Sequence, residues 1–192
     1  MKEVLLLGDS VRMAYQSAVA SMLGESFHVS APGENGRFAA YTLNSLRVWL
    51  PDMPHPDIIH WNNGLWDTAI LYREDGCFVS IEEYADALRK TLRELQKTGA
   101  KIIFALTTPV WEEKAFLTTA MPPCHKNEDI RRYNAVARTV MEQNGVIIND
   151  LYCVVEPHIK EYICEDMIHP TEIGKSVLAS AVSDKIREVL HD

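Results

Sequence analysis

The stretch Val4-Leu5-Leu6-Leu7-Gly8-Asp9-Ser10 decides the fold of this chain. Its run of apolar residues is typical of a β-strand that is buried on both faces, as in a parallel sheet covered by helices. An apolar pattern with helical spacing follows the strand and ends at Gly24. Gly8 allows a tight turn, so Ser10 stands at the start of a helix, where backbone N–H groups favour negative charge. The chain therefore opens with a strand–turn–helix unit that presents a serine.

The rest of the sequence alternates between strand and helix patterns. Further strands are predicted at residues 27–30, 58–62, 101–106 and 146–148, and further helices at 38–50, 81–98, 130–141 and 173–189. Ser80 and Glu83 form a capping box that begins the most strongly indicated helix. This alternation predicts an α/β fold in which helices cover both faces of a five-stranded parallel sheet. Because no linker or repeat divides the sequence, we expect one domain over residues 1–192.

Composition and charge exclude several classes of protein. The 192 residues, 47% of them hydrophobic, suffice for one hydrophobic core. The net charge of -8, with no cluster of Lys or Arg, argues against a nucleic-acid partner. No apolar run approaches the ~18 residues of a membrane span, and the first residues lack a secretion-signal pattern, so we expect a cytoplasmic location. The Cys residues are far apart, with no Cys-x-x-Cys pair, and indicate no metal site.

A second motif, Asp166-Met167-Ile168-His169-Pro170, lies just before the last predicted helix. In an open parallel sheet the functional site lies beyond the carboxyl ends of the strands, where Ser10 is also expected. On a turn, Asp166 can accept a hydrogen bond from Nδ1–H of His169, which leaves Nε2 to take a proton from a serine. Each motif alone has a plainer explanation, with Ser10 or Asp9 as a helix N-cap and Asp166 with His169 as a surface pair. Their joint occurrence favours nucleophilic catalysis.

Across nearly the whole chain, the sequence resembles the SGNH (GDSL-type) hydrolase family. Val4 to Ser10 resembles the nucleophile block of the family, and Asp166 to Gly174 resembles its closing Asp-x-x-His-Pro block. The resemblance implies that Ser10 is the nucleophile, His169 the general base and acid, and Asp166 the orienting carboxylate. It also implies a flavodoxin-like three-layer fold, hydrolysis of an ester through an acyl-enzyme, and no metal or other cofactor.

The two middle blocks of the family supply the donors of an oxyanion hole, a glycine backbone N–H after the second strand and an Asn side chain after the third. The loop Pro32-Gly33-Glu34-Asn35-Gly36-Arg37-Phe38 offers two glycines for the first donor. Gly36 is the expected donor, because it immediately precedes the helical stretch.

The block after the third strand departs from the usual pattern of the family. The usual Gly-x-Asn-Asp would fall on Gly64-Leu65-Trp66-Asp67, where Trp66 takes the place of Asn. Asn62 and Asn63 come before it, and strand alternation points them to opposite faces, so only one can face the site. The segment also resembles a subgroup of the family that reads Asn-x-Gly-Leu-aromatic-Asp. That likeness favours Asn62 as the donor and keeps Asn63 as its rival.

The leading hypothesis is a serine esterase that hydrolyses short-chain acyl esters of small molecules. The chain is small and acidic and has no long apolar lid segment, which favours a short acyl group on a polar alcohol such as a sugar, as in a carbohydrate O-acetylesterase. The irregular stretch from Thr108 to Asp129 is too long for a plain connection and is expected to be a binding loop.

Two other functions fit the same topology. One is a receiver-like signalling domain in which Asp9 and Asp67 form a magnesium-binding phosphoacceptor cluster. It leaves the Asp166 and His169 pair unexplained. The other is a catalytically inactive binding module of the SGNH fold, suggested by Trp66 in the place of Asn.

Overall fold

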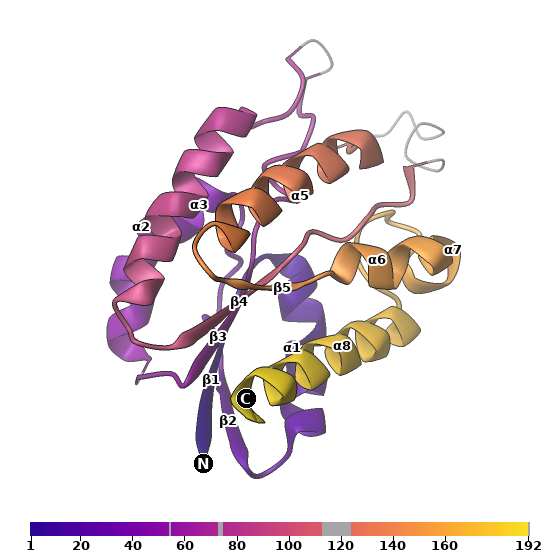
Figure 1. Cartoon of the computed structure of the whole chain (residues 1–192). Helices are drawn as coiled ribbons and strands as arrows, with labels where there is room; N and C mark the ends of the chain where they lie inside the picture. Colours follow the sequence, from indigo (N-terminus) through magenta and orange to yellow (C-terminus); the bar gives the residue numbers. More distant parts are fainter. Residues whose placement is uncertain (54, 73–74, 113–123, 192) are drawn as a thin grey trace.

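The computed structural model describes residues 1–53, 55–72, 75–112 and 124–191 (Figure 1). Its five strands form one parallel sheet in the order β2-β1-β3-β4-β5. The strands are β1 (Lys2–Leu7), β2 (Phe27–Ser30), β3 (Ile58–Asn62), β4 (Lys101–Ala105) and β5 (Ile147–Asn149). This order is that of flavodoxin-like folds, so the predicted α/β fold with a five-stranded parallel sheet is confirmed.

Helices cover both faces of the sheet (Figure 1). The long helices are α1 (Ser10–Leu23), α2 (Ala39–Trp49), α3 (Ile81–Gln96), α5 (Asn127–Glu142) and α8 (Glu172–His191). Between β5 and α8 lie the short α6 (Leu151–Val155), the 3-10 turn η2 (Glu156–His158) and α7 (Ile159–Tyr162), and a second 3-10 turn, η1 (Leu50–Asp52), follows α2. Helices α1, α6 and α8 lie on one face, and α2, α3 and α5 lie on the other. The molecule therefore has three layers.

The apolar run of β1 divides its side chains between the two faces. Val4 and Leu6 pack in the core beneath α1 and α8, and Leu5 and Leu7 pack beneath α2, α3 and α5. All four side chains are fully buried. A central strand with helices on both sides has no solvated face, which explains why its sequence does not alternate between apolar and polar residues.

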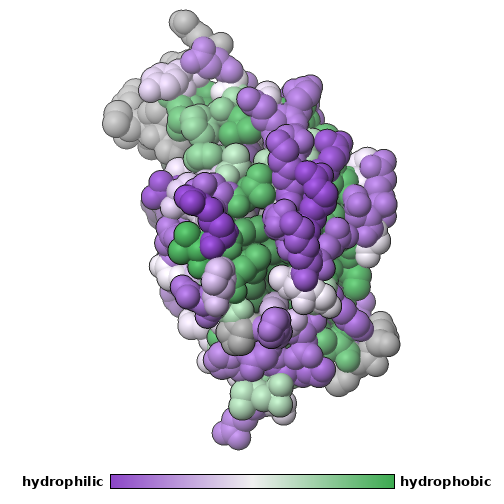
Figure 2. Space-filling view, turned by 90° about the vertical axis from the view of Figure 1, so that its left-hand side faces the viewer, coloured by the Kyte–Doolittle hydropathy of each residue, from purple (hydrophilic) through white to green (hydrophobic). Residues whose placement is uncertain are grey.

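The predicted capping box begins α3. The Ser80 N–H donates to Glu83 Oε2 at 3.2 Å, and the Glu83 N–H donates to Ser80 Oγ at 3.3 Å. Charged side chains occupy the outer face of the helix, where Lys97 pairs with Glu94 at 2.7 Å. Figure 2 shows the side on which α2 and α3 lie: hydrophilic side chains predominate, and hydrophobic ones gather near its upper end and middle.

The sheet register brings the carboxyl ends of three strands to the same level. Leu7 of β1 lies beside Trp61 of β3, which lies beside Phe104 of β4. The segments that follow these strands therefore meet at one edge of the sheet, where the site is expected. Residues 113–123, which are half of the stretch expected to be a binding loop, lie outside the described residues. Within the described ranges, no helix has the length and apolar character that a membrane crossing requires.

Candidate active site

Ser10 is the first residue of α1, and its side chain is not the cap of that helix. Asp9 is the N-cap, because its Oδ1 accepts a hydrogen bond from the Val11 N–H at 3.0 Å. The preceding Gly8 has a φ of 152°, and a Cβ there would lie 1.8 Å from Asn62 Oδ1. The turn therefore requires glycine at this position. It leaves the partly buried Ser10 hydroxyl available for a different contact.

The structure brings Ser10, His169 and Asp166 together, although Ser10 and His169 are 159 positions apart. His169 Nε2 lies 2.8 Å from Ser10 Oγ, and His169 Nδ1 lies 2.6 Å from Asp166 Oδ2. When Nδ1–H donates to the carboxylate, Nε2 carries the lone pair that can accept the hydroxyl proton of Ser10. The arrangement can therefore activate a serine as a nucleophile.

Asp166 is held by backbone hydrogen bonds as well as by the imidazole. Its Oδ1 accepts from the N–H groups of Ile168 at 3.0 Å and His169 at 2.9 Å. Burial by itself raises the pKa of Asp166, but these hydrogen bonds and the contact with the His169 ring outweigh it, so the pKa lies below its ordinary value. Asp166 is therefore an oriented carboxylate at neutral pH.

The loop that carries His169 is fixed at several points. The Cys164 N–H donates to the His169 carbonyl oxygen at 2.7 Å, and the Met167 N–H donates to the Cys164 carbonyl oxygen at 2.9 Å. The Met167 carbonyl oxygen accepts from the Trp111 N–H at 2.9 Å, which ties the loop to the segment after β4. Met167 has a φ of 74°, an uncommon conformation for a residue with a side chain. These contacts orient the imidazole before a substrate binds.

Asn63 is occupied within the fold. Its Oδ1 accepts from Trp61 Nε1 at 2.6 Å, and its Nδ2 donates to the Arg37 carbonyl oxygen at 2.9 Å and to Thr42 Oγ1 at 3.1 Å. Both hydrogens of the Nδ2 group are thus engaged. Asn63 joins the end of β3 to the loop before α2 and has no donor left for a ligand.

Asn62, the last residue of β3, lies on the opposite side of the chain, against the turn that presents Ser10. Asn62 Oδ1 is the atom that a Cβ on Gly8 would meet. Asn62 and Asp9 also line a small buried pocket. Trp66, in the position where the family has Asn, is 39% exposed. Of the two Asn residues, Asn62 is therefore the one beside the turn of the candidate nucleophile.

The expectation that Gly36 supplies an oxyanion donor is corrected by the structure. Its N–H donates to the Gly8 carbonyl oxygen at 2.8 Å, and the next N–H along the chain, that of Arg37, donates to Asn35 Oδ1 at 2.7 Å. A Cβ on Gly36 would lie 2.7 Å from the same Gly8 oxygen, so this approach requires glycine. Gly36 fixes the turn before Ser10 instead.

Arg12 is a residue of the site that the sequence interpretation missed. The side chain is fully buried, and its Nη2 donates to the carbonyl oxygens of Gly8 at 3.2 Å and Glu34 at 2.8 Å. Its Nη1 donates to the Pro32 carbonyl oxygen at 3.1 Å. The guanidinium thus joins the strand–helix turn to the loop before α2. A signal was present, because Arg12 stands three residues before Tyr15 on the buried face of the helix.

Asp9 and Asp67, the residues that a phosphoacceptor site would use, are fully buried. Both oxygens of Asp67 accept from the Ala39 N–H at the start of α2, at 3.1 and 3.2 Å. Burial raises the pKa of Asp67 to about 7 and also raises the pKa of Asp9. A phosphoacceptor carboxylate has to be ionised and accessible. The structure therefore argues against the receiver-like alternative.

His60, in the middle of β3, belongs to the core. It is fully buried, its Nε2 lies 3.2 Å from Asn149 Nδ2, and burial lowers its pKa to about 3. Within the part of the chain that the structure describes, no group of three or more His, Cys, Asp and Glu side chains is arranged to hold a metal ion.

Comparison with solved structures finds esterases and acylhydrolases with the same fold. The acetyl xylan esterase AlAXEase is 16% identical, with a TM-score of 0.76 over 96% of this chain and 99% of that one. A lipase/acylhydrolase from Enterococcus faecalis is 18% identical, with a TM-score of 0.79 over 98% and 96% of the two chains. Est24, a carbohydrate acetylesterase from Sinorhizobium meliloti, is 14% identical, with a TM-score of 0.79 over 98% and 100%.

The sequence itself matches no protein-family model and no curated protein. At the identities given above, the likeness to solved structures shows a common three-layer α/β fold. It extends over almost the whole length of each chain.

Asp67→Asn tests the buried carboxyl at the start of α2. The variant removes the titrating group and keeps an oxygen that can accept from the Ala39 N–H. Since the pKa of Asp67 in the folded chain, about 7, lies above its ordinary value of 3.8, the folded chain holds a proton that the unfolded chain has released. Asp67 therefore contributes a decrease in the free energy of unfolding as pH rises from about 4.5 to about 7, and Asp67→Asn should lack this contribution.

Urea unfolding of both proteins across this pH range measures the difference. Groups that do not interact with Asp67 titrate alike in both proteins and cancel in the comparison. Parallel curves would contradict the raised pKa.

Proposed function

We propose that this chain is a serine esterase of the SGNH type, with Ser10 as nucleophile, His169 as general base and acid, and Asp166 as orienting carboxylate. The observation that carries the proposal is the unbroken chain of hydrogen bonds from Ser10 Oγ through His169 to Asp166, at the N-terminus of a long helix. The fold that the chain shares with esterases and acylhydrolases supports a relationship to this family.

In the proposed reaction, Ser10 Oγ attacks the ester carbonyl carbon as His169 Nε2 takes the hydroxyl proton. The tetrahedral intermediate collapses when His169 returns this proton to the oxygen of the departing alcohol. Water then attacks the acyl-Ser10 ester with His169 again as the base, which releases the acid and restores the serine. Asp166 stabilises the imidazolium ion that forms in each step.

Two donors are proposed for the oxyanion. One is the Ser10 N–H, which belongs to the first turn of α1, where backbone N–H groups have no acceptor within the helix. The other is the Nδ2 group of Asn62, at the end of the neighbouring strand. Both lie near the positive end of the α1 dipole, which favours a developing negative charge.

The proposed substrates are short acyl esters of small polar alcohols, with acetylated carbohydrates as the preferred class. Two of the structural neighbours are described as an acetyl xylan esterase and a carbohydrate acetylesterase. The inactive-module alternative rests on Trp66 in the place of Asn, and it loses its basis if Asn62 supplies the side-chain donor. A panel of p-nitrophenyl acetate, p-nitrophenyl hexanoate and acetylated xylo-oligosaccharides tests the substrate class.

Ser10 should be the only residue labelled by a fluorophosphonate, because His169 activates its hydroxyl alone. Hydrolysis of p-nitrophenyl acetate should fall by at least about 10³-fold in Ser10→Ala. Ser21→Ala is the matched control, since Ser21 is an exposed serine on the same helix. Mass spectrometry locates the adduct, and a label elsewhere, or unchanged hydrolysis in Ser10→Ala, would overturn the proposal.

Asn62→Ala should lower kcat by about 10²- to 10³-fold with little effect on KM, because it removes a donor that acts mainly in the transition state. Asn63→Ala should instead lower the free energy of unfolding, by about 1–3 kcal/mol, because it leaves Trp61 Nε1 buried without its acceptor. Trp66→Phe should keep kcat near normal. A large loss of kcat in Trp66→Phe, with normal kcat in Asn62→Ala, would show that Trp66 is the donor.

Arg12→Met should lower kcat by about 10- to 100-fold, because the loop before α2 and the turn that carries Ser10 lose their common donor. Arg12→Lys should recover part of this loss, since an ammonium group keeps the charge but not the fork of donors. Arg47→Met, on the exposed face of α2, is the control. Assays are run below the thermal midpoint of each variant, and a normal kcat in folded Arg12→Met would contradict this role.

A further inference from the structure

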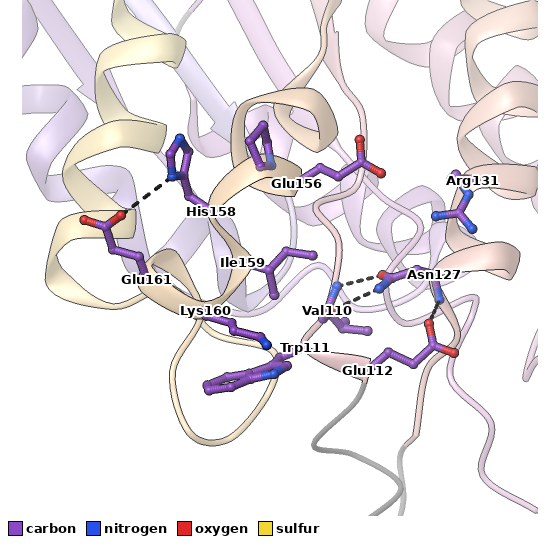
Figure 3. A pocket seen from close by; sticks show the side chains of 11 residues that line it. Val110, Trp111, Glu112, Asn127, Arg131, Glu156, His158, Ile159, Lys160 and Glu161 are labelled. Atoms are coloured by element: carbon purple, nitrogen blue, oxygen red, sulfur yellow. Dashed lines mark hydrogen bonds and ion pairs between the residues drawn. The ribbon is translucent and has the colours of Figure 1, made fainter.

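A groove of about 790 Å³ lies beside the segment that follows β4 (Figure 3). Three parts of the chain line it: residues 110–112 after β4, the first turns of α5, and residues 156–161 of η2 and α7. Its volume is within the range of pockets that bind small molecules. None of the residues proposed for catalysis lines this groove.

The groove leads toward the loop that carries His169. Trp111 and Lys160 line the groove and also line an adjoining hollow of about 540 Å³, to whose lining Asp166 and Thr171 belong as well. In addition, the Trp111 N–H donates to the Met167 carbonyl oxygen at 2.9 Å. The groove and the hollow therefore share one wall, and the hollow lies beside Asp166 of the loop that carries His169.

The side of the groove formed by α5 is fixed by hydrogen bonds. Asn127 Nδ2 donates to the Val110 carbonyl oxygen at 2.9 Å, and Asn127 Oδ1 accepts from the Val110 N–H at 2.9 Å. The Asn127 N–H donates to Glu112 Oε2 at 2.8 Å, as Figure 3 shows. These contacts hold residues 110–112 against α5, so this side of the groove is formed before a ligand arrives.

The charges around the groove are mixed. Glu112, Glu156 and Glu161 bring negative charge, and Arg131 and Lys160 bring positive charge. Figure 3 shows His158 directed at Glu161, with 3.7 Å between His158 Nδ1 and Glu161 Oε2. With both signs interspersed, the groove has no strong field to attract a highly charged anion or cation. Its polar groups suit a neutral ligand that carries many hydroxyl groups.

Apolar surface is interspersed with these polar groups. The indole of Trp111 and the side chain of Ile159 both belong to the lining. A sugar ring combines apolar C–H faces with a rim of hydroxyl groups. It can pack against such surface while its hydroxyls bond to carboxylate and guanidinium groups. An acyl chain would cover these charged groups without bonding to them, which would cost free energy of desolvation.

We propose that this groove binds the glycosyl part of the ester, a neutral oligosaccharide whose acyl group reaches Ser10. The inference rests on the proposed esterase function, and it assigns the alcohol side of the substrate to Trp111 and Glu156 on the two walls of the groove. The groove thereby sets specificity for the alcohol, and the turn around Ser10 acts on the acyl group.

Direct binding tests the groove separately from catalysis. Ser10→Ala protein is titrated with xylotetraose, an unacetylated neutral tetrasaccharide, by calorimetry. We expect saturable binding, with an affinity that falls at least 10-fold when Trp111→Ala or Glu156→Gln is added. The affinity should fall less with Trp111→Phe, because phenylalanine keeps an aromatic face. Tyr72→Ala and Glu188→Gln are the matched controls, since Tyr72 is 72% exposed and Glu188 pairs with Lys185 on α8, both outside the lining. They should leave the affinity unchanged.

Kinetics then relate the groove to the ester. The ratio of kcat/KM for an acetylated xylotetraose to kcat/KM for p-nitrophenyl acetate should fall at least 10-fold in Trp111→Ala and in Glu156→Gln. Absence of saturable binding overturns the groove proposal, as does an affinity that neither variant changes. Tighter binding of tetragalacturonate than of xylotetraose contradicts a neutral ligand. If Trp111→Ala lowers kcat/KM more for p-nitrophenyl hexanoate than for the tetrasaccharide ester, the groove binds the acyl chain and the proposal is overturned.

The two proposals fail in different ways. If Ser10→Ala leaves ester hydrolysis unchanged while the tetrasaccharide still binds through Trp111, the proposed function is wrong and the glycan site stands. If hydrolysis requires Ser10 but the tetrasaccharide does not bind, the groove proposal is wrong and the esterase stands.

Discussion

The carbonyl oxygen of Gly8 accepts the hydrogen bonds on which the arrangement of this site depends. The Gly36 N–H donates to it at 2.8 Å and Arg12 Nη2 at 3.2 Å, so the loop before α2 and the first turn of α1 meet at one atom. Neither Gly8 nor Gly36 has room for a Cβ, because each would meet an atom of the other segments at less than 3 Å. Close backbone approach therefore fixes the turn that presents Ser10, and the rest of the site is built around it.

The topology of the sheet explains how the two ends of the chain reach the same place. Helix α1 follows β1, an interior strand of the sheet, and α8 packs beside α1 on the same face. Their N-termini lie at the same edge, so the loop before α8 brings His169 to within 2.8 Å of Ser10. A serine and a histidine that are remote in sequence are thus brought together by two neighbouring helices, one of which begins at Ser10 and the other just after His169.

Local signals in the sequence predicted the fold and the residues that the structure brings together, while long-range backbone contacts escaped prediction. The strands at 27–30 and 58–62 have the predicted bounds, because β-forming residues and the flanking turn residues define them locally. The short helices after β5 carried too few residues to show a period. The role of Gly36 depends on a hydrogen bond from its N–H to a carbonyl 28 positions away, and no pattern in the loop reveals that acceptor. Arg12 does carry a local signal, because it is a cation on the buried face of a helix.

Several ionisable groups are buried around the turn before Ser10, where they lower the stability of the fold but hold the site together. Asp9, Arg12 and Asp67 are all fully buried, an environment that disfavours their charged forms. Apolar side chains of similar size would avoid this desolvation. Each group, however, bonds to backbone that no apolar side chain could hold: Asp9 to the start of α1, Asp67 to the start of α2, and Arg12 to the loop between them. Because both helices start beside the candidate nucleophile, loosening any of these contacts displaces the donors and the serine relative to each other. The cost in stability is therefore tied to the geometry of the site, because these buried groups fix the position of Ser10 relative to the loop before α2.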